Sequence, residues 1–452
     1  MPEISEQEYN QQRLQQVNEA LGSGMFVYVR KLLQQMPAYD LALILESSTA
    51  KSRPVLWQLI DPDFHGEVLE ELNEEVRKGI IKSMRPEKLA AVAEGMDVDD
   101  LAEVLRNLPD SIFNEVLNSM DSQDRSRVET ALSYEEDTAG GMMNTDTITL
   151  RPDVTVDVVL RYLRLKGNLP DATDSFYVVD RNNKFIGAVS LTAIVTAKAE
   201  VIVSSLINAE VEAVQAELGE QDVAQLFERH DWFSAPVVDE AGHLLGRITI
   251  DDVIDIIRED AEHSMMSMAG LDDEADTFAP VIKSTKQRSL WLGVNLITAL
   301  MAVAVTSMFE GVFQQLAILA VLNSLVPSMG GVAGNQTLTL VIRGMALGHV
   351  GDSNARALLS KEVAIGFLNG IIWATLIATV VAIWKQDLML GGVIAFAMLM
   401  NMTAAGLAGV SIPLLLKRLN IDPALAGSVI ITTVTDVVGI FAFLGTATLL
   451  LT

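Results

Sequence analysis

The sequence contains no cysteine, which excludes disulfide bonds, thiolate metal sites and cysteine nucleophiles. Basic residues are also scarce, because 32 Lys and Arg stand against 59 Asp and Glu in 452 residues, a formal net charge of −27. Such an acidic surface repels phosphate backbones and attracts cations, so we expect no nucleic-acid partner. The first residues are polar and acidic and lack the basic-then-apolar pattern of a signal peptide. We therefore expect the acidic part of the chain to stay in the cytoplasm.

Charged residues are almost missing from the carboxy-terminal third. Residues 289–452 hold only six acidic and six basic residues, so the excess of acid lies in residues 1–288. A helix needs about 20 apolar residues to cross the hydrocarbon core of a membrane. The five expected spans are 289–309, 312–342, 363–384, 388–416 and 423–452. The basic residues that flank them predict a multi-pass plasma-membrane protein with its amino terminus in the cytoplasm and its carboxy terminus outside.

One charge, Asp436, stands about midway along the last span. An ionised carboxylate at that depth costs roughly 3 kcal/mol on insertion scales, so it should face protein or water. A hydrogen bond to another helix would be a structural explanation, and a cation site is the functional one. Thr432, Thr433 and Thr435 lie within a turn of Asp436 and could add oxygen atoms or hold waters.

The run PSMGGVAGNQ, from Pro327 to Gln336, is the second unusual feature. Proline removes a backbone donor, and the three glycines allow helices either to approach closely or to unwind. A small-residue packing face would explain the glycines but not the adjacent Asn335 and Gln336. Exposed carbonyls and these two amides would offer oxygen ligands beside Asp436. Oxygen ligands suit a hard cation, and one carboxylate per chain, doubled by a two-fold axis, suits a hydrated Mg²⁺ ion.

Two repeats organise the acidic part of the chain. Residues 36–132 show a twelve-residue period of apolar positions, which predicts short amphipathic helices stacked into a superhelix. Phe176–Ser190 then recurs as Ala235–Thr249, and each copy predicts a helix, strand, turn, strand and helix. A tandem pair of this kind resembles a CBS pair, a module that often binds adenine nucleotides through a Ser or Thr and an Asp three residues later.

The second copy matches that nucleotide pattern with Thr249 and Asp252, whereas the first has Ser190 but Ala193. The resemblance therefore implies ATP or another adenine nucleotide at the second copy. After it, acidic residues follow one side of a predicted helix at Asp252, Asp255, Glu259 and Glu262. These carboxylates repel one another when ionised. A divalent ion would relieve the repulsion, although such a row is also typical of a solvated helix face.

The order of these regions, along essentially the whole chain, resembles the MgtE family of magnesium channels. The matching motifs are TAGGMM at 138–143, PxxGGxxGNQ at 327–336 and TTxxDxxG at 432–439. The resemblance implies a homodimer in which Asp436 binds hydrated Mg²⁺, with Gly331, Asn335 and Thr432 nearby. It also implies that cytosolic Mg²⁺ binds between acidic faces and holds the gate shut. The candidate regulatory ligands are Asp97, Asp100, Asp252, Asp255, Glu259 and Asp260.

The expected fold is multidomain and combines three classes of structure. It comprises an all-α acidic superhelix (1–135), an α/β pair of CBS domains (136–200 and 201–260), a linking or plug helix (261–288) and a five-helix α transmembrane bundle (289–452). The expected function is Mg²⁺-selective uptake through a channel in the lipid bilayer, gated by cytosolic Mg²⁺, with other divalent cations as further candidate ions.

Two other functions are compatible with parts of the sequence. In a cation-coupled secondary transporter of divalent metals, Asp436 would be protonated or carry a coupling ion, and the glycines would form a broken helix. In a membrane-anchored energy sensor, the CBS pair would bind nucleotide and the spans would only anchor it, although anchoring needs no carboxylate at mid-span. We expect no enzyme, because the sequence offers no nucleophile–base set, phosphate loop or zinc spacing.

Overall fold

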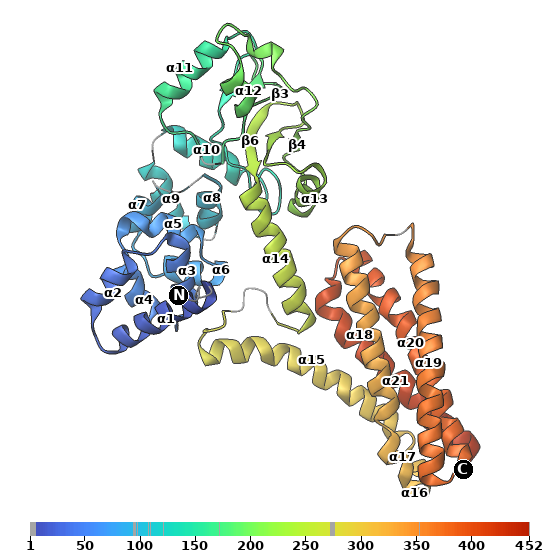
Figure 1. The fold of residues 1–452 in the computed structure, drawn as a ribbon. Coiled ribbons are helices and arrows are strands. Elements are labelled where there is room, and N and C mark those ends of the chain that lie inside the picture. Colours follow the sequence, from blue (N-terminus) through green and yellow to red (C-terminus); the bar gives the residue numbers. More distant parts are fainter. Residues whose placement is uncertain are drawn as a thin grey trace, which may run out of the picture. The chain divides into compact units, whose positions relative to one another are not determined.

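The computed structural model describes residues 6–93, 96, 98–106, 108, 110–120, 122–170, 172–271, 276–351 and 353–451. The chain forms two compact units (Figure 1). The first comprises Met1–Asp260 with Glu274–Pro280, and the second comprises Ala261–Asp273 with Val281–Thr452. In the described residues the first unit contains helices and two small mixed sheets, and the second is helical. This architecture confirms the multidomain fold class expected from the sequence.

Helices α1 to α10 form the amino-terminal part of the first unit around a single apolar core. The twelve-residue period places Met36, Ile60 and Leu72 in that core, because it returns an apolar side chain to the same face of successive helices. Each of these helices contacts the second helix after it in the chain: α3 packs against α5, α5 against α7 and α7 against α9. This pattern is typical of a superhelix. The bounds are α1 (Glu6–Gly22), α2 (Phe26–Leu33), α3 (Ala38–Glu46), α4 (Arg53–Leu59), η1 (Pro62–Phe64), α5 (His65–Glu70), α6 (Glu74–Ile81), α7 (Pro86–Ala93), α8 (Val98–Arg106), α9 (Asp110–Ser119) and α10 (Ser122–Leu132).

Two three-stranded sheets follow, one for each copy of the second repeat. In both sheets the first two strands are parallel and the last two antiparallel, and the same irregularity recurs 59 residues apart, after Val178 and after Val237. The two copies therefore fold in the same register. The bounds are β1 (Thr149–Leu150), α11 (Val156–Lys166), β2 (Ser175–Val179), β3 (Phe185–Ser190), α12 (Leu191–Thr196), η2 (Val203–Ser205), β4 (Val214–Gln215), α13 (Glu220–His230), β5 (Ser234–Val238), β6 (Leu244–Thr249) and α14 (Ile250–Met268).

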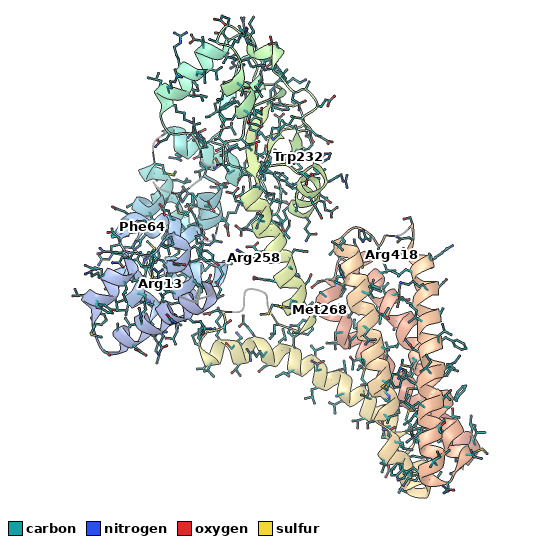
Figure 2. All side chains as sticks on the ribbon, in the orientation of Figure 1. Arg13, Phe64, Trp232, Arg258, Met268 and Arg418 are labelled. Carbon is teal, nitrogen blue, oxygen red and sulfur yellow. The ribbon has the colours of Figure 1, made fainter. Side chains whose placement is uncertain are left out.

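The expected linking helix over 261–288 is divided in the structure between two helices. Helix α14 starts directly after the second sheet and continues to Met268, and Figure 2 labels Arg258 and Met268 along it. Gly270 then adopts a left-handed backbone conformation, with φ of 68°, which is typical of a helix end. Helix α15 (Val281–Ser307) begins before the expected first span and carries it.

Five helical spans in the described part of the chain are long and apolar enough to cross a membrane. Helix α20 is the most buried of them, because 61% of its most apolar stretch is buried inside the protein. It packs against α18, α19 and α21. The helices after α15 are α16 (Glu310–Gln315), α17 (Ala317–Leu322), α18 (Leu325–Ala346), α19 (Ala355–Lys385), α20 (Leu388–Arg418) and α21 (Pro423–Leu451).

The run from Pro327 to Gln336 is helical, so its glycines serve close packing and do not unwind the chain. Pro327 lies in the first turn of α18, where a missing N–H costs no helical hydrogen bond. A Cβ atom at Gly334 would lie 2.5 Å from the Ile431 side chain of α21. The expectation of an unwound backbone with exposed carbonyl ligands is therefore corrected, because this backbone is part of a regular helix.

A buried ion pair holds the segment before α15 against the amino-terminal helices of the first unit. The Arg53 guanidinium donates to both carboxylate oxygens of Asp276, at 2.5 Å and 2.8 Å. The two side chains are 9% and 6% exposed. Arg53 also donates to the carbonyls of Leu45 and Glu46, at 2.9 Å and 3.1 Å. Because a buried charge is stable only when it is paired and hydrogen-bonded, this contact should fix residues 276–280.

Replacing Arg53 by Met should release that segment. Removing one partner of a buried ion pair typically costs about 3–5 kcal/mol, so local opening at 276–280 should become at least about tenfold more frequent. Amide hydrogen exchange of the full chain in detergent measures this change. The control Arg125→Met removes an exposed pair with Glu129 and should leave exchange at 276–280 unchanged. Identical exchange in Arg53→Met and the wild type would contradict the role of the pair.

Candidate functional site

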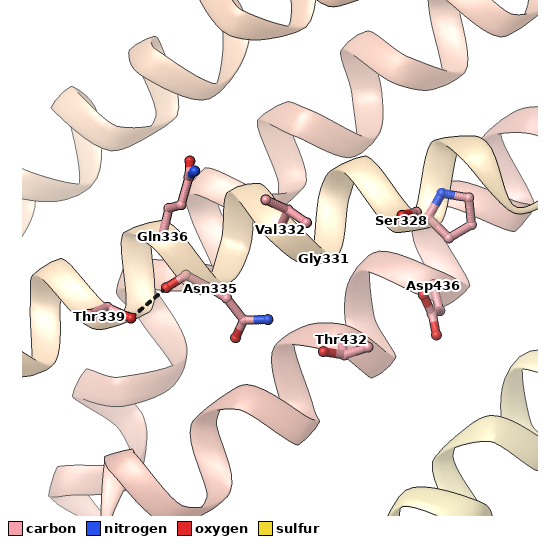
Figure 3. Close-up of a pocket in the computed structure, with 9 residues that line it drawn as sticks. Ser328, Gly331, Val332, Asn335, Gln336, Thr339, Thr432 and Asp436 are labelled. Atoms are coloured by element: carbon pink, nitrogen blue, oxygen red, sulfur yellow. Dashed lines mark hydrogen bonds between the residues drawn. The ribbon is translucent and has the colours of Figure 1, made fainter. Parts of the chain in front are cut away.

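Helices α18 and α21 of the second unit share a cleft that contains a carboxylate (Figure 3). The cleft has a volume of about 510 Å³. All four residues predicted from the sequence as pore residues line it, namely Gly331, Asn335, Thr432 and Asp436. Gly331 and Asn335 are four residues apart on α18, as are Thr432 and Asp436 on α21. This spacing puts the two residues of each helix on one face. The other lining residues are Pro327, Ser328, Val332, Gln336 and Thr339.

The polar side chains of the cleft differ in orientation. Figure 3 shows Asn335, Thr432 and Asp436 pointing to the same side, whereas the Gln336 side chain points the opposite way. Asp436 is half-buried and Thr432 is exposed. The Thr432 hydroxyl donates to the Ser428 carbonyl at 2.9 Å, which leaves its oxygen as an acceptor. Carboxylate, amide and hydroxyl oxygens can therefore act together on this side.

Two threonines that the sequence suggested as further ligands lie outside the cleft lining. Thr435 is 0% exposed, and its hydroxyl donates to the carbonyls of Ile431 and Thr432, both at 3.0 Å. The Thr433 hydroxyl donates to the Val429 carbonyl at 2.7 Å. Only Thr432, one helical turn from Asp436, shares its face.

Ser328 and Thr339 are cleft residues that the sequence analysis missed. They lie three residues before Gly331 and four residues after Asn335 on α18, which is the spacing of one helical face. The Thr339 hydroxyl donates to the Asn335 carbonyl at 3.0 Å. A helical projection of the glycine run would have found both residues, provided that the run was taken as a helix.

The chemistry of the cleft suits a hard cation that keeps part of its water. Carboxylate, amide and hydroxyl oxygens are ligands of hard ions, and the cleft offers neither thiolate nor imidazole among its lining residues. In the part of the chain that the structure describes, no three Asp, Glu or His side chains gather into a ready metal cage. An ion at Asp436 would therefore retain waters, as Mg²⁺ commonly does in proteins.

The candidate regulatory acids belong to the first unit, on α8 and α14. Asp100 lies on α8, and the other described members, Asp252, Asp255, Glu259 and Asp260, lie on α14. Asp97 falls outside the described residues. The fold brings acids of the two helices close enough to interact electrostatically. Repulsion from Asp252 on α14 is one of the causes that raise the pKa of Asp100 on α8.

Burial and mutual repulsion shift several of these carboxyls. Burial, followed by repulsion from Asp99, Glu70 and Asp252, raises the pKa of Asp100 well above its usual range. Burial and the neighbouring Asp251 raise the pKa of Asp252 to about 7, although hydrogen bonds from Thr249 oppose the shift. In the absence of a cation these carboxyls therefore hold protons more readily than exposed ones, and those that are ionised repel one another.

Glu259 extends this cluster along α14. Desolvation by the surrounding protein raises its pKa to about 7, and repulsion from Glu103 and Asp255 adds to the rise. Its side chain keeps an exposed surface, so a hydrated ion could reach it. Asp255 and Asp260 have polar neighbours instead, since Asp255 pairs with Arg258 at 2.9 Å and Asp260 accepts the Gln221 amide at 3.2 Å.

Glu103 and Glu220 are acids of this region that the sequence analysis missed. Burial raises the pKa of both, and Glu220 is further raised by Asp137 and Asp260. Glu103 is three residues after Asp100 on α8, so helical spacing could have identified it. Glu220 belongs to α13, and only the tertiary fold brings it to α14.

Thr249 and Asp252, the candidate nucleotide residues, contact each other at the start of α14. The Thr249 backbone N–H and hydroxyl both donate to the Asp252 carboxylate, at 3.2 Å and 3.0 Å. Both hydrogen bonds run from Thr249 to the carboxylate, so Asp252, in the first turn of α14, caps the backbone N–H of the residue before the helix. In the first copy, Ser190 caps α12 through the Ala193 N–H at 3.1 Å, and alanine has no side chain to reciprocate. A ribose at the second copy would have to compete with the cap.

Three family models match the chain in succession. Residues 36–137 match the MgtE intracellular N domain, residues 139–200 and 203–259 match CBS domains, and residues 323–446 match a divalent cation transporter model named MgtE. The matched segments cover the helical region, both sheets and the helices that form the cleft.

Curated relatives extend this likeness to nearly the whole chain. The magnesium transporter MgtE of Thermus thermophilus is 30% identical over 442 residues, which are 96% of this chain and 98% of the relative. That of Enterococcus faecalis is 29% identical over 434 residues, 95% of each chain. A solved structure, the cytosolic domain of the Mg²⁺ channel MgtE in complex with ATP, is 31% identical, covers 53% of this chain and 98% of its own, and has a TM-score of 0.49. With 30% identity over 96% of its length to one of these relatives, and with the three family models matching in succession, the chain belongs to the MgtE family of magnesium transporters.

Proposed function

We propose that this protein is a Mg²⁺-selective channel that admits hydrated Mg²⁺ past Asp436 and is closed by Mg²⁺ on the cytoplasmic side. The observation that carries the proposal is the cleft in which Asp436, Asn335 and Thr432 point to the same side. A carboxylate at mid-span is retained only where it meets protein, water or a cation. Here it shares a cleft with the Asn335 amide and the Thr432 hydroxyl.

The cleft supplies ligands from only two helices, α18 and α21. One chain thus offers one carboxylate to a divalent ion. In a dimer with a two-fold axis along the cleft, the same face of the second copy would add an identical set of oxygens. Two Asp436 carboxylates would then balance the charge of one Mg²⁺ ion without stripping its waters. The proposed pore therefore lies between two copies, with α18 and α21 as its wall.

The proposed gate uses the repulsion between α8 and α14. When internal Mg²⁺ is low, the acids around Asp100, Asp252 and Glu259 push the two helices apart. When internal Mg²⁺ is high, ions neutralise these carboxylates and favour the packed arrangement. A ligand shifts such an equilibrium only through its different affinity for the two states. Several weak sites that act together would give a steep dependence on Mg²⁺ concentration.

Removing the charge of Asp436 should stop transport. Asp436→Asn keeps the size of the side chain but loses its attraction for a divalent ion, so Mg²⁺ influx into proteoliposomes should fall at least about tenfold, the effect of ~1.4 kcal/mol. Asp436→Glu keeps the charge and should retain more influx than Asp436→Asn. Asp387→Asn is the matched control, because Asp387 caps α20 at an exposed position and asparagine caps a helix equally well. This variant should keep the wild-type Mg²⁺ influx. Undiminished influx in Asp436→Asn would refute the assignment of the pore.

Recordings from purified protein in a lipid bilayer should show unitary current steps carried by Mg²⁺. A secondary transporter moves its ions through a conformational cycle and gives no unitary steps. Helix α18 is regular through the glycine run. This supports a channel over a secondary transporter, because the transporter hypothesis relied on a broken helix at these glycines. Coupled flux of a second ion, with no steps at any internal Mg²⁺ concentration, would favour the carrier.

Neutralising one regulatory acid should flatten the response of the gate to internal Mg²⁺. In Glu259→Gln one carboxylate no longer repels its neighbours and no longer attracts an ion, so the packed and separated states differ less in Mg²⁺ affinity. The open probability, measured in excised patches while internal Mg²⁺ is titrated, should therefore fall less steeply. Glu200→Gln, at an exposed position in the first CBS copy, is the matched control. An unchanged slope in Glu259→Gln would remove this acid from the gate.

A further inference from the structure

Asn401 is a buried amide near the middle of α20, and it is absent from the lining of the cleft. Its side chain is 0% exposed, and apolar residues such as Ala397, Met398 and Met402 surround it in the core of the second unit. A polar side chain in such a place is costly unless it is hydrogen-bonded. A leucine of similar size would avoid that cost, so the amide requires an explanation beyond packing.

The amide contacts both helices that form the cleft. Its Nδ2 atom donates to the Val326 carbonyl of α18 at 2.8 Å. A Cβ atom at Gly330 of α18 would lie 2.1 Å from Nδ2, and one at Gly439 of α21 would lie 2.9 Å from it. Each helix therefore has a glycine at the point where the amide enters, and any larger residue there would displace it. The Oδ1 atom is buried and accepts no hydrogen bond from the described residues.

Each of these contacts is adjacent to a residue of the cleft. Val326 precedes Pro327, and Gly330 precedes Gly331, both of which line the cleft. On α21, Gly439 follows Asp436 by three residues, which is nearly one turn. The amide thus fills the joint between α18 and α21 at the depth of the Asp436 carboxylate, on the side away from the cleft.

We propose that Asn401 is a positioning residue that sets the spacing of α18 and α21, and thereby the discrimination between Mg²⁺ and Ca²⁺. The proposal rests on the proposed pore at Asp436. Mg²⁺ demands near-ideal octahedral geometry, whereas Ca²⁺ accepts variable coordination at longer distances. A small shift between the helix of Asp436 and the helix of Asn335 therefore misplaces their oxygens against the fixed octahedron of Mg²⁺-bound waters, whereas the looser shell of Ca²⁺ tolerates the shift. The hydrogen bond to Val326 fixes this spacing in a way that apolar contact alone does not.

The test compares Mg²⁺ and Ca²⁺ influx in proteoliposomes that contain Asn401→Leu. The Mg²⁺-to-Ca²⁺ influx ratio should fall roughly tenfold, because the variant keeps the packing volume but loses the fixed spacing that Mg²⁺ requires. The ratio is independent of how much protein is active, so a loss of folded protein alone would not change it. Asn369→Leu, the same substitution at an exposed position on α19, should keep the wild-type ratio. A wild-type ratio in Asn401→Leu would overturn the proposal.

A second set of variants moves the amide without replacing it. Gly330→Ala would push the Asn401 side chain out of place and should also lower the ratio. In Gly330→Ala/Asn401→Ala the room is restored but the donor to Val326 is lost, so the ratio should stay low. Recovery of the wild-type ratio in this double variant would show that only packing matters and would overturn the proposal.

The Asp436→Asn variant separates this inference from the proposed function. If Asp436→Asn still admits Mg²⁺, the pore is elsewhere and both proposals fail together. If Asp436→Asn blocks influx while Asn401→Leu keeps the wild-type ratio, the pore stands and the positioning role alone is wrong.

Discussion

A carboxylate held halfway along a membrane-spanning helix dictates much of the structure around it. Asp436 would cost roughly 3 kcal/mol against lipid, and the neighbouring helix offers it polar side chains in the shared cleft. Ser328, Asn335 and Thr339 line that cleft, whereas Gly330 and Gly334 of the same helix turn toward the rest of the bundle. The polar cleft and the close packing behind it are therefore two sides of one helix. Neither side could change much without disturbing the other.

The first unit is rich in acidic residues, in contrast to the membrane helices. In the first unit the acids outnumber the bases, and desolvation by burial raises the pKa of Asp100, Asp252 and Glu259, with repulsion from neighbouring acids adding to the rise. Repulsion of this kind stores free energy that a cation can release. In the second unit the Asp436 carboxylate would attract an ion that then passes through the proposed pore. In the first unit several carboxylates would bind ions that remain bound. Both proposed uses would rely on oxygen ligands that leave Mg²⁺ partly hydrated.

Hydropathy and local spacing predicted the membrane spans and the two repeats. Asp436 was predicted as a charge within an apolar span, whereas the choice of Gly331, Asn335 and Thr432 beside it came through the resemblance to the MgtE family. The role of the glycines was left open, since composition alone does not distinguish an unwound segment from a packing face. Asn401 could not be predicted as a contact of Gly330 and Gly439, because only tertiary structure brings three separate helices to one point. Glu220 was missed for the same reason.

In the proposed gating, a change in the first unit would act on the membrane helices through the segments that cross between the two units. The chain crosses within α14, after Asp260, and crosses for the last time at Val281, where α15 begins. The acids of α14 lie just before the first crossing, and the Arg53–Asp276 ion pair lies just before the last. A change in the packing of α8 against α14 would thus act on one continuous helix, while the ion pair would hold the start of the next. The first of these crossings lies inside α14, so a change there would be carried along a continuous helix, whereas the last lies at the start of α15, directly after the segment that the ion pair holds.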